Sequence, residues 1–145
     1  MKRARIFSYG MIPIHDSVDG RRVLLVEQYG AQGTHWGFPK GRQEPGETVK
    51  QTALRELDEE VGISNIQLRL DLRFFESYVI NRKRGPNIKK NIKYFVGTTD
   101  SMETTRQRSE VKQLGWFKLE DAKHLVVPKK RDFLDKVHRH ITQGK

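Results

Sequence analysis

The sequence predicts a single α+β domain in which strands outnumber helices. Apolar and β-branched runs of strand length recur along the chain, and at least two segments have the amphipathic period of a helix. Strands and helices do not alternate regularly, which argues against a βαβ fold and favours an α+β sandwich. The chain of 145 residues has the size of one domain and contains no repeat or linker. We therefore expect one domain over residues 1–145.

The first third of the chain predicts a pair of strands followed by irregular structure. β-rich runs at Arg3–Ile12 and Arg22–Tyr29 flank Asp19-Gly20, a dipeptide typical of hairpin turns. We expect Ala31–Trp36 to be a loop. Pro39–Gly46 should also be irregular, because two prolines and two glycines interrupt it.

A helix is predicted to follow this irregular segment. Thr48 and Gln51 have the spacing of a capping box, so the helix should begin near Val49. Gly62 favours its end, since glycine is common just after a last helical turn. The apolar residues of the segment share one face, which predicts the buried side: Val49, Ala53, Leu54, Leu57 and Val61.

The remaining elements continue the mixed pattern. Strands are expected at Ile66–Leu72, Leu72–Ile80, Ile92–Thr98 and Leu114–Leu119. A loop is expected at Asn81–Lys93, which holds six bases and no acids around Gly85-Pro86. Short helical structure follows at Glu120–Leu125, and a terminal helix can open at Pro128. The apolar stripe of that last helix is Phe133, Leu134, Val137 and Ile141.

Composition excludes several classes of protein. The chain has no cysteine, which removes disulfide scaffolds, thiolate zinc sites, iron–sulfur clusters and cysteine nucleophiles. No apolar run is long enough to span a bilayer. We therefore expect a cytoplasmic protein with no membrane partner, and a monomer is favoured over an oligomer.

The distribution of charge indicates a phosphate-bearing partner. Lys and Arg number 28 against 18 Asp and Glu, a formal net charge of +10, which favours polyanionic partners: phosphates, nucleic acid or acidic membrane surfaces. Against this basic background, Gly41–Ile63 contains six acids and only three bases. Such an island is either a solvated helix face or a cation site that faces a phosphate substrate.

Three glutamates of the expected helix decide between these alternatives. Glu56, Glu59 and Glu60 are three or four residues apart, so their carboxylates can converge, and Glu60 borders the buried face. Like charges at these spacings destabilise a helix, and partial burial adds a desolvation cost. A divalent cation would remove both penalties, and oxygen ligands of this kind suit Mg²⁺ or Mn²⁺.

A longer pattern surrounds these glutamates. Gly41 is followed after five residues by Glu47 and after seven more by Arg55-Glu56-Leu57-Asp58-Glu59-Glu60-Val61-Gly62-Ile63. This pattern resembles the Nudix box without a departure, and the preceding Trp36–Lys40 segment and the strand order resemble the same family. The resemblance implies an α/β/α sandwich with a mixed sheet, in which the box forms a loop–helix–loop catalytic motif.

The resemblance also implies an activity and the residues that carry it. The family hydrolyses nucleoside diphosphates linked to a further group, using metal-activated water, with Mg²⁺ as cofactor and Mn²⁺ as a substitute. The matching metal ligands are Glu56, Glu59 and Glu60, joined by the Gly41 carbonyl, while Glu47 and Arg55 brace the helix. Glu110, expected in a loop at Arg106–Leu114, matches a downstream glutamate that serves as a further ligand or base. Its alternative is a solvated loop acid.

The substrate is indicated by weaker similarities. Pro39-Lys40-Gly41 and the segment Lys90–Phe95 resemble asymmetric diadenosine tetraphosphate hydrolases, in which Lys40 would contact phosphate and Tyr94 would stack on adenine. Arg42 and Lys90 complete the expected substrate-binding set. Ordinary packing in a strand is the alternative for Tyr94.

Other activities stay open at this point. RNA 5′-pyrophosphohydrolases share the box and the downstream glutamate, and the Arg82–Lys93 cluster would suit an RNA 5′ leader or simply be a solubilising loop. Inositol pyrophosphate hydrolases are a third, less similar group. A non-catalytic module that binds nucleotide or RNA would be expected to lack carboxylates of the box, and here all are present.

Overall fold

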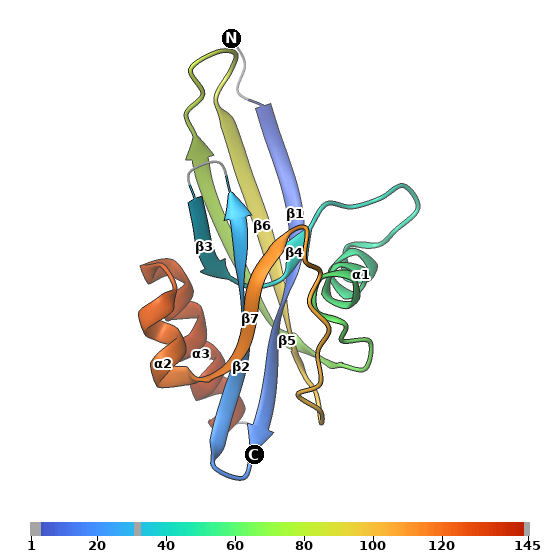
Figure 1. The fold of residues 1–145 in the computed structure, drawn as a ribbon, viewed down its shortest axis with the longest axis vertical. Helices are drawn as coiled ribbons and strands as arrows, with labels where there is room; N and C mark the ends of the chain where they lie inside the picture. The colour runs from blue at the N-terminus through green and yellow to red at the C-terminus, as the bar shows by residue number, and fades with distance from the viewer. Residues whose placement is uncertain (1–3, 31–32, 144–145) are drawn as a thin grey trace.

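The computed structural model of the chain describes residues 4–30 and 33–143 (Figure 1). Arg3 of the first expected strand, and Ala31 and Gln32 of the expected loop, lie outside the described residues.

Within the described residues, seven strands form one mixed sheet. They are β1 (Ala4–Ser17), β2 (Gly20–Gly30), β3 (Gly33–Gly37), β4 (Lys40–Gly41), β5 (Gln67–Ile80), β6 (Ile88–Thr98) and β7 (Val111–Lys118). The order is β3-β2-β1-β6-β5, with β4 paired to β1 and β7 paired to β2. The β1–β6 pair is parallel and the other pairs are antiparallel.

Helices cover both faces of this sheet. On one face lies α1 (Val49–Val61), and on the other lie α2 (Leu119–Leu125) and α3 (Pro128–Gln143), as Figure 1 shows. Each helix layer has its own apolar cluster: Leu57 packs with Met11 and Phe95, whereas Phe133 packs with Ile12 and Tyr94. The architecture is the expected α/β/α sandwich with a mixed sheet.

Burial on both faces explains the most apolar strands. Met11–Ile14 of β1 and Val23–Val26 of β2 are continuous apolar runs, and all eight residues are buried. A strand covered on both sides needs apolar residues at every position, whereas a half-exposed strand alternates. These two central strands therefore anchor the loops that follow them.

The acidic helix begins and ends where the sequence predicts. The Thr48 side chain accepts a hydrogen bond from the Gln51 backbone N–H at 3.2 Å, and the Gln51 side chain accepts one from the Thr48 N–H at 2.8 Å. Gly62 ends α1 with a φ of 73°, a left-handed conformation that favours glycine. These caps fix the register in which the glutamates of α1 are presented.

Several local predictions were wrong. The expected loop at Ala31–Trp36 contains β3, because Thr34 and Trp36 pair with β2 despite their polar surroundings. The two strands expected at Ile66–Leu72 and Leu72–Ile80 are one strand, β5, with an irregular register between Leu68 and Arg73. A long partner strand holds this irregular segment in one ladder, which local periodicity does not reveal.

The expected loop at Asn81–Lys93 is shorter than predicted. β6 already begins at Ile88, so Lys90 lies in a strand. Pairing on both sides extends this strand, since Ile88 lies opposite Ala4 of β1 and Ile80 of β5. Likewise β7 begins at Val111, within the loop expected at Arg106–Leu114, and Glu110 directly precedes it.

None of the helices in the described ranges combines the length and the apolar character that a membrane crossing requires.

Candidate active site

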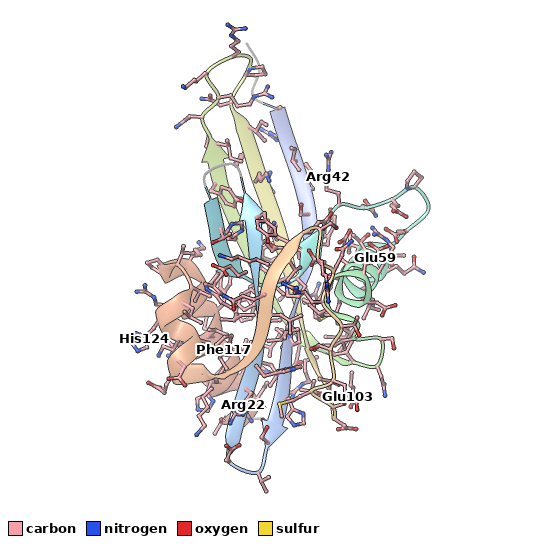
Figure 2. The ribbon with its side chains drawn as sticks, in the orientation of Figure 1. Arg22, Arg42, Glu59, Glu103, Phe117 and His124 are labelled. Carbon is pink, nitrogen blue, oxygen red and sulfur yellow. The ribbon has the colours of Figure 1, made fainter. Side chains whose placement is uncertain are left out.

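Arg55 stands at the centre of the acidic side of α1. Its Nε donates to Oε2 of Glu47 at 2.6 Å, and its Nη2 donates to Oε1 of the same carboxylate at 3.1 Å. Its Nη1 donates to Glu56 Oε1 at 3.0 Å and to Glu59 Oε2 at 3.1 Å. One guanidinium therefore holds three carboxylates of the box, of which Glu59 is labelled beside α1 in Figure 2.

Glu47 ties the loop before α1 to the helix itself. Besides Arg55, its Oε1 accepts hydrogen bonds from the Glu44 backbone N–H at 2.9 Å and from Thr52 Oγ1 at 3.0 Å. The Arg55 hydrogen bonds lower the pKa of Glu47 to about 2 and raise the pKa of Arg55 above its ordinary value. Both groups therefore stay charged at neutral pH, and the loop that carries Gly41 is held against α1.

Glu60 lies on the other side of the acidic stripe and points into the sheet. Its side chain is 1% exposed. Oε1 accepts a hydrogen bond from Gln28 Nε2 at 2.6 Å, and Oε2 accepts one from the Lys40 backbone N–H at 3.0 Å. Burial, and next the charge of Glu56, raise the pKa of Glu60 to about 8. A buried carboxylate of this kind is costly unless a positive charge compensates it.

Glu56 lies between the Arg55–Glu47 pair on one side and Glu60 on the other, and its carboxyl group lies against the backbone of Gly41. A Cβ built on Gly41 would overlap the Glu56 carboxyl group, so only glycine leaves room for it. Burial raises the pKa of Glu56, and the charges of Glu59 and Glu110 raise it further. The Glu110 charge also contributes to the raised pKa of Glu60. The turn before β7 thus brings Glu110 toward the same carboxylates.

The carboxylates meet the chemical requirements of a hard divalent cation. They supply oxygen ligands, they repel one another, and the Glu56 carboxyl sits in a space beside Gly41 that a larger residue would fill. The described residues contain no ready-made group of three acidic or histidine ligands, because Glu59 is held by Arg55 and Glu60 turns toward Gln28. Simultaneous ligation by all three requires Glu59 to leave Arg55.

A basic cluster lies behind the carboxylates. It consists of Lys40 on β4, Lys90 on β6 and Lys130 on α3. Burial is the main cause that lowers the pKa of Lys40, and the nearby charges of Lys90 and Lys130 lower it further. Burial and the same lysines lower the pKa of His35 on β3, which favours its neutral form at neutral pH. Arg42, the remaining member of the expected substrate set, is exposed beside β1 (Figure 2).

One acidic side chain compensates part of this cluster. Glu76 on β5 and Lys130 on α3 are 7% and 8% exposed. Lys130 Nζ donates to both carboxylate oxygens of Glu76 at 3.0 Å. This buried ion pair therefore connects α3 to the sheet through Lys130, a member of the basic cluster.

Tyr94 lies in the core and not at a surface. Its side chain is 0% exposed, its ring contacts Phe38 and Phe133 edge-on or tilted, and its hydroxyl donates to Glu76 Oε1 at 3.4 Å. In this position the ring offers no free face to an adenine. The structure therefore favours the packing interpretation of Tyr94.

Sequence reasoning missed four polar residues of the site, although a signal was present. Three of them stand at positions whose period-2 or helical neighbours face the core. Gln28 follows Leu24 and Val26 on the α1-facing side of β2, Glu76 follows Leu72 and Phe74, and Lys130 precedes Phe133 and Leu134. His35 lies on β3, which was not expected. The sequence signal for such a site residue is therefore a single polar residue among apolar neighbours that face the core.

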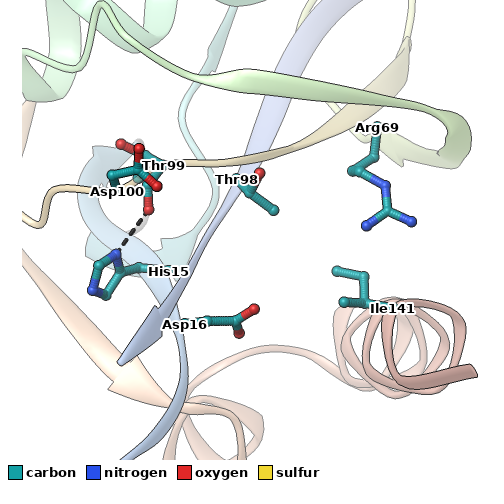
Figure 3. Close-up of a pocket in the computed structure, with 7 residues that line it drawn as sticks. All are labelled: His15, Asp16, Arg69, Thr98, Thr99, Asp100 and Ile141. Atoms are coloured by element: carbon teal, nitrogen blue, oxygen red, sulfur yellow. Dashed lines mark hydrogen bonds between the residues drawn. The ribbon is translucent and has the colours of Figure 1, made fainter. Parts of the chain in front are cut away.

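A separate cavity lies away from these groups. It has a volume of about 360 Å³ and is lined by His15, Asp16, Arg69, Thr99 and Asp100, among others (Figure 3). His15 Nδ1 and the Thr99 carbonyl are 2.8 Å apart, and Asp16 forms an ion pair with Arg21. The cavity shares no residue with the carboxylates or the basic cluster.

The family model described as the NUDIX domain matches residues 8–137, and the chain therefore belongs to the Nudix hydrolase family. Members of this family generally use divalent metal ions.

The curated relatives include enzymes whose names give different substrates. The chain is 30% identical over 109 residues to the asymmetrical bis(5′-nucleosyl)-tetraphosphatase of Caenorhabditis elegans, which covers 75% of this chain and 77% of the relative. It is 27% identical over 132 residues to the RNA pyrophosphohydrolase of Pelagibacter ubique, covering 84% and 81%. It is 28% identical over 123 residues to the m7GpppN-mRNA hydrolase dcap-2 of C. elegans, covering 82% of this chain. The chain spans only 14% of that third relative's length.

Solved structures support the fold. A binary complex of C. elegans Ap4A hydrolase superposes with a TM-score of 0.82 at 22% identity, covering 95% of this chain and 98% of that one. At this identity the likeness establishes the fold alone.

Proposed function

We propose that this chain is a Mg²⁺-dependent pyrophosphohydrolase that splits a phosphoanhydride bond in nucleoside polyphosphates, with dinucleoside polyphosphates such as diadenosine tetraphosphate as the preferred substrates. The observation that carries the proposal is the pair Glu56 and Glu60. Both carboxyls are withdrawn from water, and their pKa values are raised. Next to a basic cluster, such a pair suits a cation that bridges protein and phosphate.

The acidic side chains have distinct roles in this proposal. Glu56, Glu59 and Glu60 would hold the ion, together with the Gly41 carbonyl, and Mn²⁺ would be accepted in place of Mg²⁺. A bound divalent cation would neutralise charge on the diphosphate and lower the pKa of its bound water. Arg55 and Glu47 position the helix and its entry loop through their paired hydrogen bonds.

Glu110 is the proposed further ligand or base. Its charge acts on both Glu56 and Glu60, and it is exposed at the start of β7, where it can accept a proton from water.

The basic side chains would bind the phosphate chain. Lys40 is held at the site by its own backbone N–H, which donates to Glu60, and Lys90 lies near it. Arg42 supplies its carbonyl to Arg55 Nη2 at 2.9 Å, which leaves its exposed side chain available to an outer phosphate. Similarity to a bis(5′-nucleosyl)-tetraphosphatase supports a long phosphate chain as substrate.

A substrate panel at fixed Mg²⁺ tests the proposal. Diadenosine polyphosphates, nucleoside triphosphates, 5′-triphosphorylated RNA, ADP-ribose and inositol pyrophosphates are ranked by kcat/KM. We expect diadenosine tetraphosphate to rank first and Glu56→Gln to abolish its hydrolysis. Binding of nucleotide without turnover at any Mg²⁺ or Mn²⁺ concentration would contradict the proposal and favour a non-catalytic module.

RNA 5′-pyrophosphohydrolysis is the second candidate. The observation that favours it is the cluster of six cations between Arg82 and Lys93, at the end of the sheet that projects beyond the helices in Figure 1. Similarity to an RNA pyrophosphohydrolase over 84% of the chain agrees with it. First rank of 5′-triphosphorylated RNA in the same panel would establish this candidate over the first.

A further inference from the structure

One end of the sheet projects beyond both helix layers. Three segments form this arm: residues 4–10 of β1, residues 73–80 of β5, and residues 88–93 of β6, with residues 81–87 as its tip (Figure 1). From Ile88 to Lys93 the arm extends roughly 17 Å at about 3.3 Å per residue. We call these segments the basic arm.

The basic arm carries positive charge with almost no compensation. Its cations are Arg5, Arg73, Arg82, Lys83, Arg84, Lys89, Lys90 and Lys93. Its only acid is Glu76, which is buried and paired with Lys130. In the described part of the chain, no ion pair joins any of these eight cations to a carboxylate. Clustered unpaired cations are the electrostatic footprint of a polyanion site.

Exposed aromatic rings lie among these cations. Phe7 on β1 is 53% exposed and Phe75 on β5 is 64% exposed. Lys93 of β6 lies between their strands, opposite Phe75 in the register, with its Nζ 5.9 Å from the Phe75 ring centre. Both rings are therefore accessible to a partner that binds along this face of the arm. Rings interleaved with cations are the pattern by which proteins bind single-stranded nucleic acid.

The same face of the arm leads to the acidic helix. Tyr9 of β1 pairs with Lys93 on one side and with Gly41 on the other. Gly41 in turn lies against the Glu56 carboxyl group. A chain bound along Phe7, Phe75 and Lys93 would thus lie two strand spacings, roughly 10 Å, from Gly41 and the carboxyl group beside it.

We propose that the basic arm is the binding surface for the 5′-proximal segment of a single-stranded RNA whose phosphorylated end enters the site at α1. Backbone phosphates contact the cations of the tip and of β6, and unstacked bases lie on Phe7 and Phe75. The tip at residues 81–87 is the part of the arm farthest from α1, so we expect the tip to contribute only to a chain longer than a dinucleotide. The inference rests on the proposed function for the position of the RNA 5′ end.

Binding of a short fluorescent single-stranded RNA with a 5′-triphosphate tests the surface, measured by anisotropy over a series of salt concentrations. All proteins carry Glu56→Gln, so that turnover does not consume the probe. We expect Lys83→Glu/Arg84→Glu to weaken binding at least about tenfold and to lower the salt slope by about 1.4, the value for two single-strand phosphate contacts. Lys136→Glu/Arg139→Glu on α3 makes the same charge change away from the arm and should stay within about twofold.

A second pair of variants tests the rings. Phe75→Ala should weaken RNA binding about tenfold, the loss expected for one stacked base. Leu70→Ala truncates another exposed apolar residue of β5, 55% exposed and outside the arm, and should have no effect. Equal losses in arm and control variants, or an unchanged salt slope, would overturn the proposal. Binding to phosphatidylserine vesicles as tight as to RNA would also overturn it.

Separate readouts distinguish failure of this inference from failure of the proposed function. In the otherwise wild-type protein, Lys83→Glu/Arg84→Glu should leave diadenosine tetraphosphate hydrolysis unchanged and lower kcat/KM only for RNA. Normal arm-dependent RNA binding by a protein with no hydrolytic activity would refute the function and retain the arm. Hydrolysis of diadenosine tetraphosphate by a protein whose RNA binding does not depend on the arm would refute this inference and retain the proposed function.

Discussion

Glu60→Gln removes a buried negative charge and preserves the shape of the side chain. In the folded protein burial raises the pKa of Glu60 from 4.5 to about 8. The unfolded chain ionises near the ordinary value, so the folded state binds more protons between these two pH values and its stability falls as pH rises through them. At about pH 7 the raised pKa lowers the free energy of unfolding by at most roughly 3 kcal/mol, because each pH unit above the ordinary pKa contributes about 1.36 kcal/mol.

Glutamine can keep both hydrogen bonds of this position. Its carbonyl oxygen can accept from the Lys40 backbone N–H, and its amide can donate to Gln28 if the Gln28 amide turns over. The variant therefore escapes the ionisation cost without leaving a buried group unpaired. We expect metal-free Glu60→Gln to be more stable than the wild type by about 1–3 kcal/mol at about pH 7, and nearly equal at about pH 4.5.

Thermal and urea unfolding in EDTA at the two pH values measure this difference. A chain of this length should show a rise in Tm of about 2–4 °C per kcal/mol. Mg²⁺ should stabilise the wild type more than the variant, because binding to the folded state alone raises stability. Glu59→Gln, at an exposed carboxylate, is the control and should stay within about 0.5 kcal/mol. A pH-independent difference, or full turnover by Glu60→Gln, would refute the reasoning.

Substitutions at three further positions test neighbouring groups. Gly41→Ala introduces a Cβ where the Glu56 carboxyl lies, and should lower kcat about 100-fold or more with an unchanged circular dichroism spectrum. Glu110→Gln should lower kcat by about 10²-fold with little change in Tm, whereas an unchanged pH–rate profile would exclude it as the base. Tyr94→Ala should destabilise the fold by about 3–5 kcal/mol, while Tyr94→Phe should cost about 1 kcal/mol and leave KM for diadenosine tetraphosphate unchanged. A raised KM in Tyr94→Phe would restore a substrate role for the ring.

The predictable part of the fold is the part dictated by local chemistry. The capping box at Thr48 and the glycine at Gly62 set the ends of α1 through contacts within a few residues, and both were predicted correctly. The strand β3 and the start of β6 depend on partners far along the chain. Residues such as Gly33 or Lys89 have no strand preference of their own, so only the pairing partner determines their structure.

The candidate site was predictable to the same degree. Helical spacing placed Glu56 and Glu59 on one side of α1 with Arg55, and put Glu60 at the border of the buried face. Spacing along one helix does not reveal which groups of the sheet meet it. The hydrogen bond from Gln28 to Glu60 joins residues 32 positions apart, and therefore appears only in the folded chain.

The central claim is that α1 gathers a divalent cation for phosphoanhydride hydrolysis. A crystal of the wild type with Mn²⁺ and a non-hydrolysable diadenosine tetraphosphate analogue tests it most directly, through the anomalous signal of the metal. The account predicts Mn²⁺ density in contact with Glu56 and Glu60 and with a substrate phosphate oxygen, and Glu59 released from Arg55. Ordered analogue beside carboxylates that keep their present contacts, with no anomalous density between them, would contradict it.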